Sequence, residues 1–162
     1  MIKQLFSKYK SYIISILISL GTGILSALLT MRNMDIAAVA NMPPLSPPAF
    51  LFPIVWTILF ILMGVSAARI FDRRNKNPEV ARSGLTYYAM SLVVNLTWSI
   101  IFFNLHSYLI ASVWIVLLLA LIVLTVIRYA VIDKISAYLQ IPYILWVSFA
   151  TYLTFGIFYL NG

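Results

Sequence analysis

Charged residues divide the chain into long uncharged stretches, and these stretches set the helices that we predict. The run between Lys10 and Arg32 is long enough to cross about 30 Å of hydrocarbon as one helix. The next run is too long for one span and is divided by a proline-rich segment at residues 43–48. A run from 83 to 127 holds two spans around a polar turn at residues 104–107, and a last span follows Lys134. The pattern predicts five transmembrane helices, at about residues 11–31, 49–68, 83–103, 107–127 and 135–160.

The composition agrees with a protein whose solvent is mostly lipid. Hydrophobic residues make up 63% of the chain, charged residues 9%, and the mean hydropathy is +1.01. A soluble fold needs far more charge to cover its surface. We therefore predict an all-α integral membrane bundle that forms a single domain over residues 1–162. The N-terminal apolar run has span length and no small-residue cleavage pattern follows it, so we expect it to remain as the first helix.

The basic residues predict the orientation in the cell membrane. With five spans, ten of the eleven Lys and Arg residues fall on the side of the N-terminus, and only Arg32 falls on the other. This bias predicts a cytoplasmic N-terminus and an external C-terminus. We interpret the net charge of +7 as this topology signal, with membrane lipid and not nucleic acid as the expected partner. A lipid-binding or nucleic-acid-binding patch is the alternative interpretation of the basic loops.

Ionisable side chains are missing from the predicted span interiors. All four acidic residues lie in loops or at span ends, and the single histidine, His106, lies in a turn. Ion-coupled transporters and pumps need such groups at mid-depth, so we do not expect that class. With one histidine and no cysteine, the sequence predicts no metal site and no catalytic thiol. No other residue stands out as catalytic.

Three predicted spans carry aromatic or weakly polar stripes at helical spacing, and each stripe includes a tryptophan inside the span. Tryptophan normally prefers the membrane interface, where its N–H stays hydrated. We therefore predict an aromatic pocket for a flat apolar ligand, with helix packing as the alternative. A kink is expected at Pro142 in the fifth span. The predicted ligand-binding residues are Phe52, Trp56, Phe60, Asn95, Trp98, Phe102, Trp146, Ala150 and Leu153.

Small residues in the first span and prolines after it have structural interpretations. Ser15, Ser19, Gly23 and Ala27 repeat every four residues, which predicts close helix packing within the bundle or between protomers. The connection at residues 31–48 is long, and its prolines stiffen it toward polyproline II. We predict a lid over the pocket, with a rigid linker as the alternative. The predicted lid residues are Pro43, Pro44, Leu45, Pro47 and Pro48.

Several of these segments together resemble the translocator protein family, TspO/MBR, also known as the peripheral benzodiazepine receptor family. The segments are 43–50 (PPLSPPAF), 55–57 (VWT), 95–103 (NLTWSIIFF) and 141–153 (IPYILWVSFATYL), in the family's order along the chain. The resemblance implies a five-helix bundle, often dimeric, that binds porphyrin, haem or benzodiazepine-site ligands between its helices under the first loop. The implied pocket uses the stripe residues named above, and porphyrin or haem enters as a ligand, with no other cofactor.

The resemblance implies a role in stress sensing, sequestration or transport of tetrapyrroles. Two alternatives are a light-dependent porphyrin-degrading enzyme and a membrane scaffold with no small ligand. The chain departs from the family where members commonly carry a Trp-Tyr pair in the first loop, since Ile36 and Ala37 stand there, and Leu45 replaces the usual tryptophan between the prolines. Thr154 stands where asparagine is typical. With fewer loop aromatics, we expect porphyrin binding with little light-driven conversion.

Overall fold

The structure is a computed structural model that describes residues 1–162 as a bundle of long helices without strands. The helices are α1 Ile2–Thr30, α2 Leu51–Asp72, α3 Pro78–Ser99, α4 Tyr108–Ile132, α5 Lys134–Leu139 and α6 Ile141–Asn161. Two 3₁₀ turns, η1 Ile36–Ala38 and η2 Arg74–Lys76, lie in connections, and a π-helical turn, η3 Ile100–Asn104, extends α3.

Five helical segments are long and apolar enough to cross a membrane, which confirms the predicted all-α membrane fold. These segments are Ile2–Thr30, Leu51–Asp72, Pro78–Asn104, Tyr108–Ile132 and Lys134–Asn161. The first helix begins well before the predicted residue 11, because residues 2–10 contain neither proline nor glycine to end it. The charged residues of this extension therefore do not mark the end of the helix.

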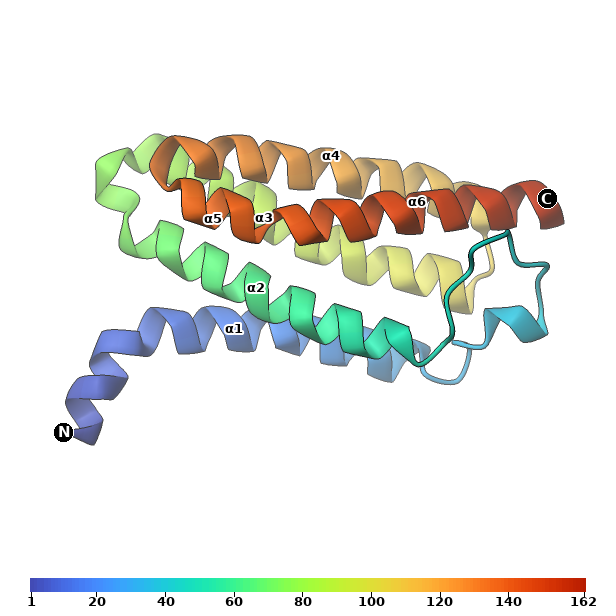
Figure 1. Ribbon diagram of the computed structural model, residues 1–162, viewed down its shortest axis with the longest axis horizontal. Coiled ribbons are helices and arrows are strands. Elements are labelled where there is room, and N and C mark those ends of the chain that lie inside the picture. Colours follow the sequence, from blue (N-terminus) through green and yellow to red (C-terminus); the bar gives the residue numbers. More distant parts are fainter.

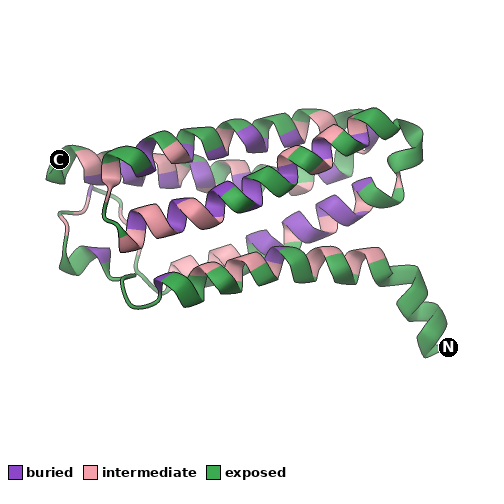
Figure 2. Cartoon of the chain, turned by 180° about the vertical axis from the view of Figure 1, so that it is seen from behind, coloured by how far each residue is buried: buried purple, intermediate pink, exposed green.

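The helices form two groups that enclose the interior. In Figure 1, α1 and α2 lie side by side, and α3, α4 and α6 lie together across from them. The chain between α1 and α2 crosses the end of the bundle that also holds the C-terminus, whereas the N-terminus lies at the opposite end (Figure 1). Buried residues face inward and exposed residues outward, and α1 is exposed along most of its length (Figure 2). The outward apolar surface is what a bilayer-spanning bundle presents to lipid.

The small residues of α1 pack against α2 of the same chain. The Ser19 hydroxyl is buried and donates a hydrogen bond to the Phe60 carbonyl oxygen at 2.7 Å. Gly23 lies directly against the Phe60 ring. The within-bundle interpretation of this seam is therefore the one that the structure supports at these positions.

The predicted kink near Pro142 is seen as an interruption of one residue between α5 and α6. Gln140 separates the two helices, and Pro142 lies in the first turn of α6, where its missing N–H removes no helical hydrogen bond. Buried side chains fix the break: Gln140 Nε2 donates to Ser66 Oγ at 3.3 Å, and Ser66 Oγ donates to the Ser136 carbonyl oxygen at 2.7 Å. The break lets α6 take its own direction along the interior.

Candidate ligand-binding site

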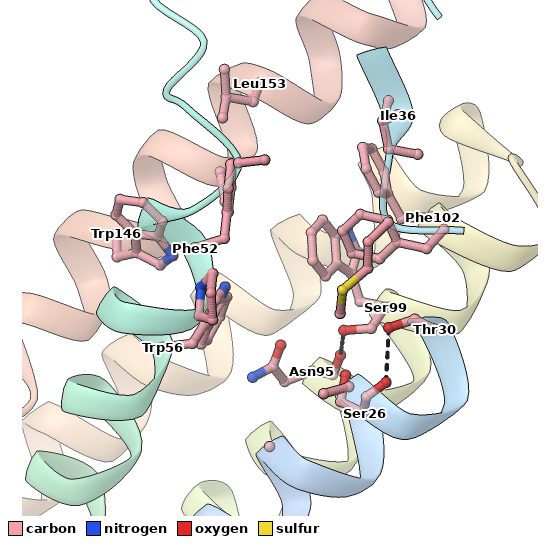
Figure 3. A pocket seen from close by; sticks show the side chains of 18 of the residues that line it. Ser26, Thr30, Ile36, Phe52, Trp56, Asn95, Ser99, Phe102, Trp146 and Leu153 are labelled. Atoms are coloured by element: carbon pink, nitrogen blue, oxygen red, sulfur yellow. Dashed lines mark hydrogen bonds between the residues drawn. The ribbon is translucent and has the colours of Figure 1, made fainter. Parts of the chain in front are cut away.

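A cavity of about 430 Å³ lies between the two helix groups, under the connection that follows α1. Residues from α1, α2, α3, η3 and α6 form its walls, and residues of the connection close its outer end. Figure 3 shows Trp146, Phe52 and Trp56 on one side of this space and Phe102 and Ile36 on the other. The lining is mostly apolar, as is usual for small-molecule sites.

The structure brings all nine predicted ligand-binding residues to this cavity. Their i, i+3 and i+4 spacing places each stripe on one helix face, and the three faces meet in the interior. Phe52, Trp56 and Trp146 are half-buried, and the other six are buried. The nine lining residues are Phe52, Trp56, Phe60, Asn95, Trp98, Phe102, Trp146, Ala150 and Leu153.

Two stacked aromatic pairs and one edge-to-face pair lie around the cavity. Trp56 stacks on Phe60 with ring centroids 5.6 Å apart, and Trp98 stacks on Phe102 at 5.1 Å. Phe52 meets Trp146 edge to face at 5.8 Å. These distances fall in the range in which aromatic pairs stabilise each other's orientation. The rings therefore support one another's orientation around the cavity.

Few polar groups of the cavity are free to bind a ligand. Asn95 is only 4% exposed, and its amide extends into the space beside Trp56 (Figure 3), with the buried Tyr143 hydroxyl as a polar neighbour. The Ser99 and Thr154 hydroxyls donate to carbonyl oxygens one turn back in their own helices, at 3.1 and 2.7 Å. The indole N–H groups of Trp98 and Trp146 are buried without an acceptor. Asn95 is thus the polar side chain best placed to orient a bound molecule.

Comparison with known proteins identifies the family. The TspO/MBR family model matches residues 15–160 of the chain. The chain belongs to the TspO/MBR family. It is 46% identical over 119 residues to the tryptophan-rich protein TspO of Chlorobaculum tepidum, covering 74% of this chain and 75% of that relative. It is 37% identical over 119 residues to protein CrtK of Rhodobacter capsulatus, covering 74% of each chain.

A third relative is the tryptophan-rich sensory protein of Cereibacter sphaeroides, which is 29% identical over 121 residues, covering 75% of this chain and 73% of the relative. Family membership and the five apolar helices make this TspO/MBR protein a multi-pass membrane protein. Of the segments that carried the resemblance in the sequence, 43–50 lies in the connection before α2, and the others lie on α2, on α3 with η3, and on α6, all of which contribute residues to the cavity.

The connection after α1 in this TspO/MBR protein is tied to α6 at several points. Asn161 accepts a hydrogen bond from the Asn41 N–H at 2.7 Å and donates one to the Asn41 carbonyl oxygen at 3.0 Å. The Tyr152 hydroxyl donates to the Pro44 carbonyl oxygen at 2.8 Å. Pro43 packs on Gly156, where a Cβ would lie 2.7 Å from the proline ring. The connection therefore rests on the end of α6 in a fixed path.

This path gives the predicted lid residues different places. Pro47 lines the cavity, whereas Pro43 and Pro44 face α6. Leu45 is 83% exposed in a left-handed backbone conformation (φ 66°), so the expectation that Leu45 covers a ligand is wrong. Pro48 is exposed and does not line the cavity either. The cover comes from elsewhere in the connection, because the contacts to α6 turn the residues around Leu45 outward.

Several lining residues escaped the sequence analysis. From the connection these include Ile36 and Ala37, which were expected only as apolar cover in place of the family's aromatic pair and not as pocket residues. From α1 they are mostly small or weakly polar residues: Gly23, Ser26, Ala27 and Thr30. The small-residue repeat marked this face of α1 in the sequence. A repeat of this kind is the same for residues that pack against another helix and for residues that line a cavity.

Proposed function

We propose that this protein binds flat tetrapyrrole-type ligands, such as porphyrin or haem, or benzodiazepine-site ligands, in the cavity under the connection. Its role would be stress sensing, sequestration or transport of such a ligand. The observation that carries the proposal is the cavity itself: about 430 Å³, within the membrane-spanning bundle, between two stacked aromatic pairs. Small-molecule sites typically occupy about 300–1,000 Å³ and have such apolar walls with few polar groups.

The chemistry of the walls supports a flat aromatic ligand. Trp56 and Trp98, each already stacked on a phenylalanine one turn away, offer large rigid faces from opposite helix groups. A ring system inserted between them gains apolar burial and stacking without ordering many side chains. The Asn95 amide, which extends into this space (Figure 3), can then fix the ligand's orientation through one polar contact.

A scaffold that binds no small molecule is expected to have a filled interior, whereas this bundle contains a cavity. A bundle that only packs has no reason to keep about 430 Å³ of open space beside the buried Asn95 side chain, since protein interiors are close-packed. The name of the Cereibacter sphaeroides relative, tryptophan-rich sensory protein, agrees with the sensing role in our proposal. Light-dependent porphyrin breakdown stays an alternative prediction, which a new product spectrum on illumination of the complex would favour.

Alanine substitutions in the cavity test the proposal. We expect Trp146→Ala and Asn95→Ala to weaken binding of a porphyrin more than Trp114→Ala does. Loss of a stacked ring should cost about 1–3 kcal/mol of binding free energy. Trp114 is the matched control, because its indole donates to Thr97 Oγ1 at 2.8 Å on the far side of α3 and does not line the cavity.

Tryptophan fluorescence quenching during titration with the porphyrin measures the three affinities, and circular dichroism checks that each variant keeps its helices. Equal losses in the Trp114 and Trp146 variants would show that binding does not use the cavity. No saturable binding to the unmodified protein would refute the proposal itself.

A further inference from the structure

Three tyrosine side chains from different helices meet in the interior of the bundle. Tyr88 lies on α3, Tyr129 on α4 and Tyr143 on α6, and their exposed fractions are 6%, 0% and 1%. The Tyr88 hydroxyl lies near both of the other phenols. All three hydroxyl oxygens are enclosed, and none makes a hydrogen bond to another group of the protein. The membrane-spanning bundle therefore holds three unpartnered phenol groups in one part of its interior.

Two further buried polar side chains border these phenols. Asn95, two turns after Tyr88 on α3, lies beside the Tyr143 hydroxyl and also lines the ligand cavity. Ser19 of α1 lies beside the Tyr88 hydroxyl, and because it donates its own proton to the Phe60 carbonyl oxygen, its oxygen can accept another hydrogen bond. The five side chains come from four helices and offer donors as well as acceptors. We call them the polar cluster: Ser19, Tyr88, Asn95, Tyr129 and Tyr143.

We propose that the polar cluster is a binding site for internal water, in which one or more water molecules bridge the three phenols and their two polar neighbours. The phenols lie near one another without bonding directly, and a water molecule bridges such groups because it can donate two hydrogen bonds and accept two. Water in this place joins α1, α3, α4 and α6. The inference goes beyond the proposed function, since only Asn95 of the cluster lines the ligand cavity.

The physical reason is the cost of burying a polar group without a partner. A phenol hydroxyl carries one donor and two lone pairs, and its transfer out of water is unfavourable unless hydrogen bonds replace the lost hydration. Nearly all buried polar groups in proteins find a partner in the chain or in ordered water. The charge of the interior excludes an ion as the expected partner, because no Lys, Arg, Asp or Glu side chain is buried in this protein to neutralise it.

Solid-state NMR that transfers magnetisation from water to the protein tests the proposal directly, on the full chain in phosphatidylcholine bilayers. Tyrosine labelled with ¹³C at Cζ gives signals from the 10 tyrosines, and the spectra of Tyr88→Phe, Tyr129→Phe and Tyr143→Phe assign those of the cluster. We expect these three carbons to receive magnetisation from water several-fold faster than the labelled δ1 methyl of Ile115, because a bridging water lies in contact with each phenol. Ile115 is the dry reference, at 1% exposure in the apolar core.

Phenylalanine substitutions separate hydrated hydroxyls from dry ones. Removal of a dry, unpartnered hydroxyl lifts a desolvation cost, so the melting temperature would stay the same or rise. If water bridges the phenols, Tyr88→Phe and Tyr129→Phe should each lower the melting temperature by roughly 2–4 °C. The double variant should lose clearly less than the sum of the two, because both substitutions act on the same water. Tyr159→Phe, on an 87% exposed side chain, is the control and should leave the melting temperature unchanged.

Replacement of Na⁺ and K⁺ by choline in the buffer checks the identity of the occupant, and it should change neither the water transfer nor the melting temperature. A loss of either would indicate an alkali cation in the polar cluster and would overturn the assignment to water. The inference is also overturned if the three carbons receive magnetisation from water no faster than Ile115 does. Phenylalanine variants that melt no lower than the unmodified protein would contradict it as well. None of these measurements involves a porphyrin, so the proposed function is tested separately.

Discussion

At the scale of single residues, Gly64 shows how a missing side chain sets the distance between α1 and α2. A Cβ at this position would lie 2.6 Å from the Ile16 Cα and 2.8 Å from Ser19 Oγ. The first of these atoms is backbone and cannot turn aside, so α1 would have to move away. Such close approach through small residues is the usual basis of helix association in membranes, where lipid offers no hydrophobic drive.

We therefore predict that Gly64→Ala destabilises the protein by about 1–3 kcal/mol, the typical cost of overpacking a filled interface. Gly21→Ala is the matched control on α1, since a Cβ there would meet nothing within 4 Å, and it should be neutral or stabilise by up to about 1 kcal/mol. Thermal unfolding in one detergent, followed by circular dichroism, measures both. If the two variants melted at the same temperature, Gly64 would not control the helix distance.

At the scale of elements, Asp133 joins the end of α2 to the start of α5. Its Oδ2 accepts hydrogen bonds from Arg69 Nε at 2.8 Å, Ser136 N–H at 3.2 Å and Ser136 Oγ at 2.6 Å. Burial raises the pKa of Asp133, but the hydrogen bonds from Arg69 and Ser136 together outweigh it and lower the pKa from 3.8 to about 2. The carboxylate thus caps α5 in its ionised form.

Because the folded pKa lies below the unfolded one, the stabilisation from Asp133 is complete above about pH 4 and is lost as the pH falls toward 2. We predict that Asp133→Asn lowers the unfolding free energy at pH 7 by about 2 kcal/mol, the size of such a pKa difference. Melting temperatures at pH 7 and pH 3 test this: the unmodified protein should lose more stability between them than the variant does. An equal loss would mean that the pair contributes no pH-dependent stability.

The connection after α1 is the second element whose contacts make a prediction. Asn161→Ala removes both side-chain hydrogen bonds to Asn41, so the segment around Asn41 should open more readily. At about 1 kcal/mol for each lost bond, amide hydrogen exchange in residues 39–42 should rise by roughly tenfold or more. Tyr159→Phe, on an 87% exposed side chain of the same helix that makes no hydrogen bond, is the control. Unchanged exchange in the Asn161 variant would show that other contacts hold this segment.

At the scale of the whole molecule, charge and topology agree on a direction across the membrane. The connections from α2 to α3 and from α4 to α5 lie at the end of the bundle near the N-terminus (Figure 1), and together with the helix ends beside them they hold seven of the eleven basic residues. The connection after α1 lies at the opposite end, with Arg32 as its one basic residue. The cytoplasmic placement of the N-terminus stays a prediction from this asymmetry.

Cysteine labelling in cells tests the orientation. Because the chain has no native cysteine, only the introduced cysteine can react. Cysteines introduced at Asn75, in η2, and at Ser107, before α4, should react from opposite sides of the membrane. A membrane-impermeant reagent added outside should label the Ser107 variant alone. Labelling of both from one side, or of the Asn75 variant alone, would contradict the prediction.

The five spans and three walls of the cavity could be predicted from the sequence. A bilayer leaves no water to satisfy backbone groups, so an uncharged run of sufficient length must form a helix, and hydropathy with charge is enough to find it. Within each span, helical periodicity decides which residues share a face, which is why Trp56, Asn95 and Trp146 could be assigned to one interior. These are local rules, and they need no knowledge of the neighbouring helix.

The tertiary structure alone decided where the remaining contacts fall. The small residues of α1 from Gly23 to Thr30 line the cavity, although Gly23 also packs against Phe60 of α2, and no local pattern in the sequence separates these two roles. Leu45 points outward because the connection is held to α6 by bonds such as that from Asn41 to Asn161, between residues 120 positions apart. Asp35 lies at the cavity for the same reason. Contacts between distant segments depend on how all five helices pack, and that information lies in the assembled fold.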